Sequence, residues 1–195
     1  VTLPAHDRDF VAMNIAVAGL VFYRLWRAGY FDARLFWPFA LGSIPLAFVG
    51  GALTLPGGIY KVLVAVTLLV AASRLLWKAQ DQEAASTPNI FLALACGAGL
   101  GFLSGLTGVG GGIFLSPLLL LLRWANMRTT AAVSAAFILV NSIAGLAGHA
   151  SVALQWPAQL PALMLAALAG AVIGSELAVR RLAPVTLRRV LGVVL

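Results

Sequence analysis

Long apolar segments joined by short polar connections make up most of the chain. Each segment approaches the roughly 20 apolar residues that a helix needs to cross a bilayer. Six such segments occupy residues 10–25, 36–55, 59–77, 97–122, 131–148 and 157–179, and the start of a seventh runs to residue 195. The pattern predicts an all-α protein, a polytopic transmembrane helical bundle with six complete spans and part of a seventh.

One sustained polar connection, KAQDQEAASTPN at 78–89, divides the predicted helices into two groups. We expect 1–77 to hold the transmembrane helices of a first repeat and 90–195 those of a second, with 78–89 as the linker. The prediction of two domains of related architecture rests on this division.

The two groups share a patch of small residues. The patches, PLAFVGGALTL and AGAVIGSELAV, align at an offset of 124 residues. The matched positions are Ala47 with Ala171, Gly50 with Gly174, and Leu53 with Leu177. The first half has no counterpart of the glycine-rich segment, so we expect a missing first span before Val1 and a truncated last span.

The segment GAGLGFLSGLTGVGGGIFLSP holds eight glycines between residues 97 and 112 and carries no charge. A glycine inside a helix costs about 1 kcal/mol relative to alanine, so this density needs a structural or functional reason. Gly97, Gly101 and Gly105 recur every four residues. That spacing predicts one helix face against which a neighbouring backbone packs closely.

The glycines in the second half of this segment are too dense for a packing face; they are Gly108, Gly110, Gly111 and Gly112. We predict a broken helix here, with a new helix starting before Ile113. Broken helices persist in membranes where protein buries the freed main chain or where it lines a polar cavity. A helix start presents N–H groups and a positive dipole end, which predicts an anion site near the bilayer middle. The alternative is that all eight glycines serve helix packing alone.

Polar side chains near the break are candidate substrate-binding groups. Ser104 and Thr107 flank Gly105 and offer hydroxyl donors, although both could instead bond back to a helical carbonyl. Asn141 and Ser142 lie in the middle of an apolar helix, where an amide must find a partner inside the protein. This pair has two alternative roles, a contact with the substrate or a structural hydrogen bond between helices.

Two further residues are candidates for coupling or gating. Glu176 is the acid within a predicted span, and it stands four residues before Arg180, a spacing that favours an ion pair on one helix. A proton-coupling carboxylate is the alternative. His149 ends a predicted helix, where its imidazole either satisfies terminal carbonyls or acts in gating.

Composition agrees with a membrane protein. The chain is 62 % hydrophobic and 10 % charged, with a mean hydropathy of +1.00, whereas about a quarter of the residues in a soluble domain are charged. The net charge of +7 does not predict nucleic-acid binding, because membrane proteins concentrate Lys and Arg in cytoplasmic loops. One cysteine, Cys96, and two separated histidines predict no metal site and no cofactor. No nucleophile, base and orienting group fall together, so an enzyme is not expected.

The distribution of basic residues depends on how the glycine-rich segment crosses the bilayer. If every segment crosses once, eight Lys and Arg residues lie on one side of the membrane and five on the other. The richer side then includes Arg123 and Arg128, and the poorer side includes Arg24, Arg27 and Arg34. The positive-inside rule then favours the richer side as cytoplasmic. A glycine-rich segment that re-enters would reverse the assignment of everything after it.

The motif G-x-x-S-G-L-x-G-x-G-G-G at 101–112, with Pro117 five residues later, resembles the signature of the TauE/SafE sulfite exporter family. That family is similar to this chain in having two related halves, each opened by such a motif. The resemblance implies a permease of the cell membrane, multi-pass and typical of a bacterial inner membrane, that moves small sulfur-containing anions such as sulfite or organosulfonates.

Two alternatives belong to other classes of function. One is a membrane assembly or partner-binding protein that transports nothing, and the other is a transporter of a different small anion. The partners expected are a small anionic substrate and the lipid bilayer, without nucleic acid, and a homo-oligomer is left open.

Overall fold

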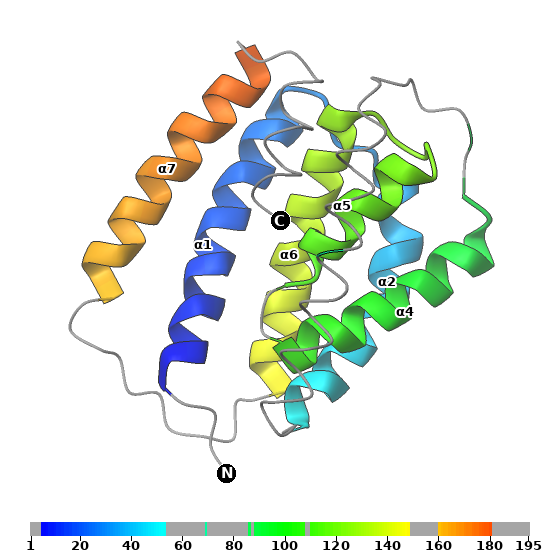
Figure 1. Ribbon diagram of the computed structural model, residues 1–195, viewed down its shortest axis with the longest axis horizontal. Helices are drawn as coiled ribbons and strands as arrows, with labels where there is room; N and C mark the ends of the chain where they lie inside the picture. The colour runs from blue at the N-terminus through cyan, green and yellow to red at the C-terminus, as the bar shows by residue number, and fades with distance from the viewer. Residues whose placement is uncertain are drawn as a thin grey trace.

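The computed structural model describes residues 5–53, 69, 86, 88–107, 110–148 and 160–180. The helices with defined bounds are α1 (Ala5–Arg27), α2 (Ala33–Ala52), α4 (Ile90–Thr107), α5 (Gly112–Leu121), α6 (Met127–Gly148) and α7 (Leu160–Arg180). Every element of regular structure in these ranges is a helix, as Figure 1 shows, so the predicted all-α class is confirmed. The predicted span at 59–77 lies outside the described residues, apart from position 69.

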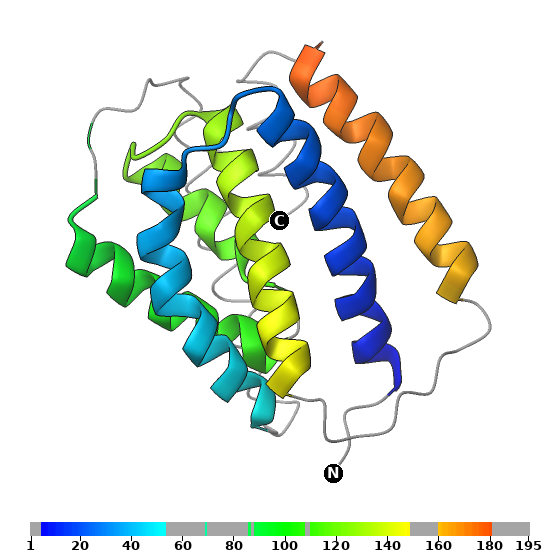
Figure 2. The ribbon, with the colours of Figure 1, turned by 180° about the vertical axis from the view of Figure 1, so that it is seen from behind.

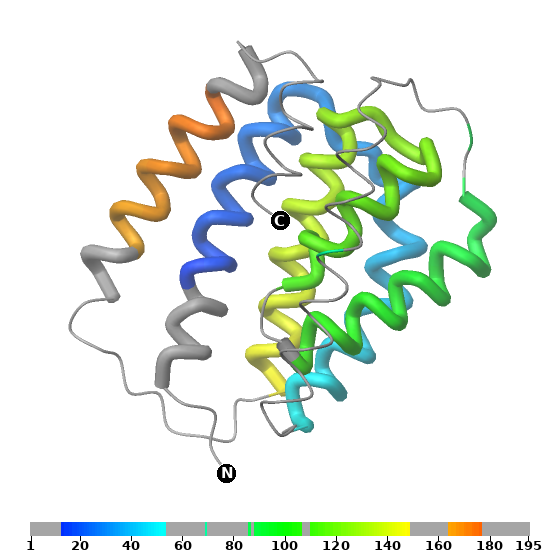
Figure 3. The backbone as a smooth tube through the Cα atoms, viewed as in Figure 1, coloured from blue at the N-terminus to red at the C-terminus, as the bar shows by residue number. Residues whose placement is uncertain are grey.

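Helix α6 is the centre of the bundle. It packs against α2 on one side and α1 on the other, and α7 packs on the outer side of α1 (Figures 2 and 3). Phe39 of α2, Phe137 and Val133 of α6, and Leu115 and Leu119 of α5 are fully buried and form the main apolar core. The core therefore lies where α2, α5 and α6 meet.

Two of the helices described, α2 and α6, are long and apolar enough to cross a membrane by length and composition. Shorter apolar stretches lie at 90–106 in α4, 112–121 in α5 and 164–176 in α7. These helices make up the greater part of the predicted helical bundle, and the count of six complete spans stays a prediction.

Short polar side chains fix where three of the helices begin. The Asp32 carboxylate accepts hydrogen bonds from the N–H groups of Arg34 (2.9 Å) and Leu35 (3.2 Å) at the start of α2. Asn89 caps α4 in the same way, and Asn126 caps α6. Each cap satisfies amides that the first helical turn leaves without a partner.

The glycine stripe on α4 packs directly on α2, as its four-residue spacing predicts. A methyl group added at Gly97 would overlap the main chain of Phe39, and one added at Gly101 would overlap the main chain of Ser43. Gly105 meets the main chain of Ala47 in the same way. The first half of the glycine-rich segment is therefore a packing surface that lets two backbones touch.

The chain reverses direction between α4 and α5, as in the re-entrant alternative rather than in a segment that crosses once. Figure 1 shows α5 running back from the end of α4 toward the side of the molecule where α4 begins, and Figure 2 shows the same from behind. Helix α5 has only 10 residues, which corresponds to a length of about 15 Å. The glycine-rich segment is thus a helical hairpin of the re-entrant kind.

This reversal changes the predicted distribution of positive charge. Arg128 at the start of α6 donates to the Tyr30 hydroxyl (3.0 Å) in the α1–α2 connection, so it lies at the same end of the bundle as the arginines it was expected to oppose. The segments at this end are the last turn of α1 with Arg24 and Arg27, the start of α2 with Arg34, the connection from α5 to α6 with Arg123 and Arg128, and the end of α7 at Arg180. By the positive-inside rule we expect this end to face the cytoplasm.

Candidate anion-binding site

The predicted helix break is confirmed at Gly110–Gly112, which we call the glycine turn. Gly110 has φ +80° and Gly111 has φ +69°, and α5 begins at Gly112. This left-handed region costs about 1–2 kcal/mol for a residue with a side chain, which explains glycine at both positions. Gly108, also expected in the site, lies outside the described residues.

Part of the main chain in the turn is satisfied internally. The Gly112 N–H donates to the Gly110 carbonyl (2.9 Å), and the N–H groups of Phe114 and Leu115 donate to the Gly111 carbonyl (3.1 and 3.2 Å). The new helix start therefore offers fewer free amides than its sequence predicts. The amides of Gly110 and Gly111, which donate to no other described residue, are the candidate donors, and Gly111 caps α5 without a side-chain hydrogen bond.

Helices α4 and α6 enclose the turn. The position that a Cβ would take on Gly110 lies 2.8 Å from Ser142 Oγ and 2.7 Å from Ile138 Cγ2. The equivalent position on Gly111 lies 2.9 Å from the Ser104 Cβ. The structure thus brings Ser104 and Ser142, two of the predicted site residues, to opposite sides of the glycine turn.

Ser142 supplies the most informative polar group at the turn. Its side chain is 3 % exposed, and its Oγ has no hydrogen-bond partner within the ranges that the structure covers. A buried hydroxyl without a partner costs about 1–3 kcal/mol, so such a group calls for an explanation, and a bound ligand is one. Ser142 can donate to a ligand bound at the turn.

Asn141 is buried beside Ser142, but its amide has a different role from the one expected. Its Nδ2 donates to the Phe137 carbonyl (2.9 Å), which is a bond within α6. Its Oδ1 is buried and has no partner in the described part of the chain. The free group is an acceptor, so Asn141 suits a protonated oxygen of a ligand rather than a negative one.

The remaining predicted residues are divided between packing and positions that the structure does not describe. Gly105 lies against α2 and, at 3.7 Å from the Cβ position of Gly145, near α6, so packing accounts for it. Thr107 is the last residue of α4, and its side chain lies outside the described part. His149 lies outside it as well. A site role for these residues stays a prediction.

Glu176 of α7 forms an ion pair with a residue of another helix, α1. Its carboxylate forms an ion pair with Arg24 of α1, and Arg24 also donates to the Val172 carbonyl of α7 (2.8 Å). The Arg180 side chain lies outside the described residues, so the expected pairing within α7 stays a prediction beside this ion pair. The ion pair joins α7 to α1 and gives Glu176 a structural role, while a coupling role stays untested.

Three further residues lie at or beside the turn without having been predicted from the sequence. Ser116 of α5 donates to the Gly112 carbonyl (2.9 Å) and is hydrogen-bonded to Ser134 of α6 (2.8 Å). Ile138 contacts the turn from α6. Ser134, Ile138 and Ser142 recur every four residues and therefore lie on one face of α6. This spacing is the sequence signal that could have identified Ser134 and Ile138 from Ser142.

A bundle of apolar helices around a buried, irregular turn with unpartnered polar groups has the organisation of a membrane transporter. Residues 10–195 match the family model described as sulfite exporter TauE/SafE. The chain belongs to the TauE/SafE sulfite exporter family and is a membrane protein of the transporter class.

Curated relatives agree with this assignment. The chain is 34 % identical over 190 residues to the probable membrane transporter protein y4hK of Sinorhizobium fredii, covering 95 % of this chain and 77 % of the relative. It is 37 % identical over 87 residues to the probable membrane transporter protein MJ0441 of Methanocaldococcus jannaschii, covering 45 % and 31 % of the two chains. No solved structure matches the chain. The family and both names describe transporters rather than enzymes.

Proposed function

We propose that this protein is a multi-pass permease of the cell membrane that carries small sulfur-containing oxyanions such as sulfite or organosulfonates. The observation that carries the proposal is the buried Ser142 hydroxyl beside the glycine turn, which has no hydrogen-bond partner among the described residues. The description of the family as sulfite exporters supports the class of substrate. The partners proposed are this anion and the surrounding lipid.

The donors at the turn suit an anion that must bind and then leave. The amides of Gly110 and Gly111 and the hydroxyl of Ser142 are neutral groups, and each contributes a directed hydrogen bond without a full positive charge. Moderate binding of this kind permits release, which transport requires.

Substitution of Ser142 by alanine tests the proposal. We expect the anion flux to fall about tenfold or more, because a hydrogen bond to a charged group is worth about 1.5–3 kcal/mol. We expect thermal stability in detergent to be unchanged or higher, because the variant removes a buried hydroxyl that has no partner in the described structure. Both are measured on purified protein, with flux in proteoliposomes loaded with radiolabelled sulfite.

Ser175→Ala is the matched control. The Ser175 hydroxyl donates to the Val172 carbonyl (3.1 Å) in α7, away from the glycine turn, so the flux should stay at the wild-type level. If Ser142→Ala keeps the wild-type flux, the site is wrong. If it loses assembly instead of flux, Ser142 is a packing residue, as in a protein that transports nothing.

A further inference from the structure

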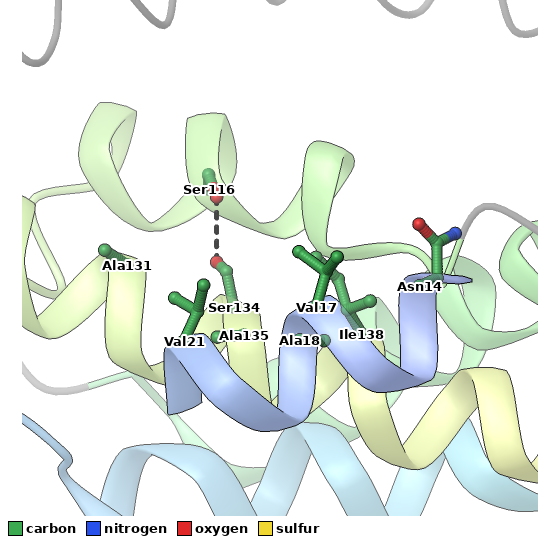
Figure 4. A pocket seen from close by; sticks show the side chains of 9 residues that line it. All are labelled: Asn14, Val17, Ala18, Val21, Ser116, Ala131, Ser134, Ala135 and Ile138. Atoms are coloured by element: carbon green, nitrogen blue, oxygen red, sulfur yellow. Dashed lines mark hydrogen bonds between the residues drawn. The ribbon is translucent and has the colours of Figure 1, made fainter. Parts of the chain in front are cut away.

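A cavity lies next to the glycine turn, between α1 and α5 and over α6. It has a volume of about 220 Å³ and its walls are mostly apolar. Figure 4 shows side chains from all three helices around it. The lining residues are Asn14, Val17, Ala18, Val21, Ser116, Ala131, Ser134, Ala135 and Ile138.

Ile138 is the side chain that separates this cavity from the turn. One side of it lines the cavity, and its Cγ2 lies 2.7 Å from the Cβ position of Gly110. Its Cδ1 lies equally close, at 2.7 Å, to the Cβ position of Gly112. A single aliphatic side chain therefore lies between this open cavity and the proposed anion donors.

The polar groups of the cavity lie close to this side chain. Ser116 and Ser134 are hydrogen-bonded to each other across the cavity wall, as the dashed line in Figure 4 shows, and Ser116 also bonds to the Gly112 carbonyl. Ser134 stands one helical turn before Ile138. The Ser116 and Ser134 hydroxyls thus lie between the cavity and the glycine turn, and Ser134 is on the same face of α6 as Ser142.

We propose that the cavity is the passage by which the anion reaches the glycine turn, and that Ile138 is the gate that limits the size of the anion. The inference rests on the proposed function. Helices α1 and α5 both pack on α6, and the Ile138 side chain both lines the cavity and contacts the turn. The side chain at 138 should therefore determine which sulfonates pass.

The test compares Ile138→Ala with Ile143→Ala. Ile143 is on the same helix, is 50 % exposed and does not line the cavity. In proteoliposomes, Ile138→Ala should raise the flux of a larger sulfonate relative to methanesulfonate about threefold or more, since small pocket changes give discrimination of this order or larger. Ile143→Ala should keep the wild-type ratio. An unchanged ratio in Ile138→Ala would overturn the gate.

Thiol labelling provides a second measurement that does not depend on flux. In a Cys96→Ala background the chain has no other cysteine, so Ile138→Cys can be labelled selectively. A sulfonate-bearing methanethiosulfonate reagent should modify this cysteine, and methanesulfonate should slow the reaction, whereas Ile143→Cys should show no protection. Absence of modification at 138 would overturn the passage.

The two proposals fail in different ways. If Ser142→Ala abolishes flux while Ile138→Ala keeps the wild-type size preference, the anion site stands and the gate is wrong. If Ser142→Ala keeps full flux, the proposed function is wrong, and the proposal that Ile138 is a gate is then wrong as well.

Discussion

Alanine in place of Gly110 or Gly111 is expected to reduce anion flux about tenfold or more while the protein still reaches the membrane. Both residues have positive φ, where a side chain costs about 1–2 kcal/mol. The added Cβ would also meet Ser142 and Ile138 at position 110, or Ser104 and Phe137 at position 111. The turn must shift, and the donors then no longer converge on the anion.

Gly99→Ala is the matched control for this experiment. Gly99 lies in α4, and the structure shows nothing within 4 Å of its Cβ position. Alanine there should keep the flux and favour the helix by about 1 kcal/mol. The amount of protein in the membrane, measured by quantitative fluorescence of a tagged protein, distinguishes a turn that binds the anion from a turn that serves only packing. Wild-type flux in Gly110→Ala would contradict the site, and a parallel loss of assembly would indicate packing alone.

Valine in place of Gly101 should have the largest effect on stability. The Cβ position of Gly101 overlaps the main chain of Ser43, which cannot move as a flexible side chain can. Overpacking of this kind typically costs about 1–3 kcal/mol, and a backbone overlap belongs at or above the upper end. We expect little monodisperse protein in detergent and a strongly lowered melting temperature.

Gly99→Val provides the comparison, because it places the same β-branched residue two positions away on the open face of α4. It should retain a melting temperature close to that of the wild type. Equal stability of the two variants would show that α2 and α4 do not cross through this glycine. Together the two glycine experiments assign packing to the first half of the motif and binding to the second.

The sequence predicted the helix break and left open whether the chain reverses there. The density of glycines from 108 to 112 localised the break, because so many residues without side chains cannot all serve one helix face. Composition carries no information on the direction in which the next helix leaves. That direction follows from the packing of α5 on α6 and the core, with Phe114 and Leu115 buried. Arg123 and Arg128 therefore lie on the side that the re-entrant alternative gives them, not on the side that a single crossing would give.

Long-range contacts explain the other differences. The four-residue spacing of Glu176 and Arg180 is a local rule, whereas the observed partner, Arg24, comes from a helix more than a hundred residues earlier. Ser142 was found because a polar residue in an apolar helix is conspicuous. Ile138 was missed because its type does not distinguish a gate from any other apolar residue of the bundle. Only the structure shows that it lies between a cavity and the turn.

The central claim is that the main chain of the glycine turn donates hydrogen bonds to the transported anion. Nuclear magnetic resonance of ¹⁵N-glycine-labelled protein during a sulfite titration tests this directly, with signals assigned by single glycine substitutions. We predict saturable shifts of the Gly110 and Gly111 amides and none at Gly99. Unmoved signals for Gly110 and Gly111, at sulfite concentrations that support saturated flux, would contradict the account.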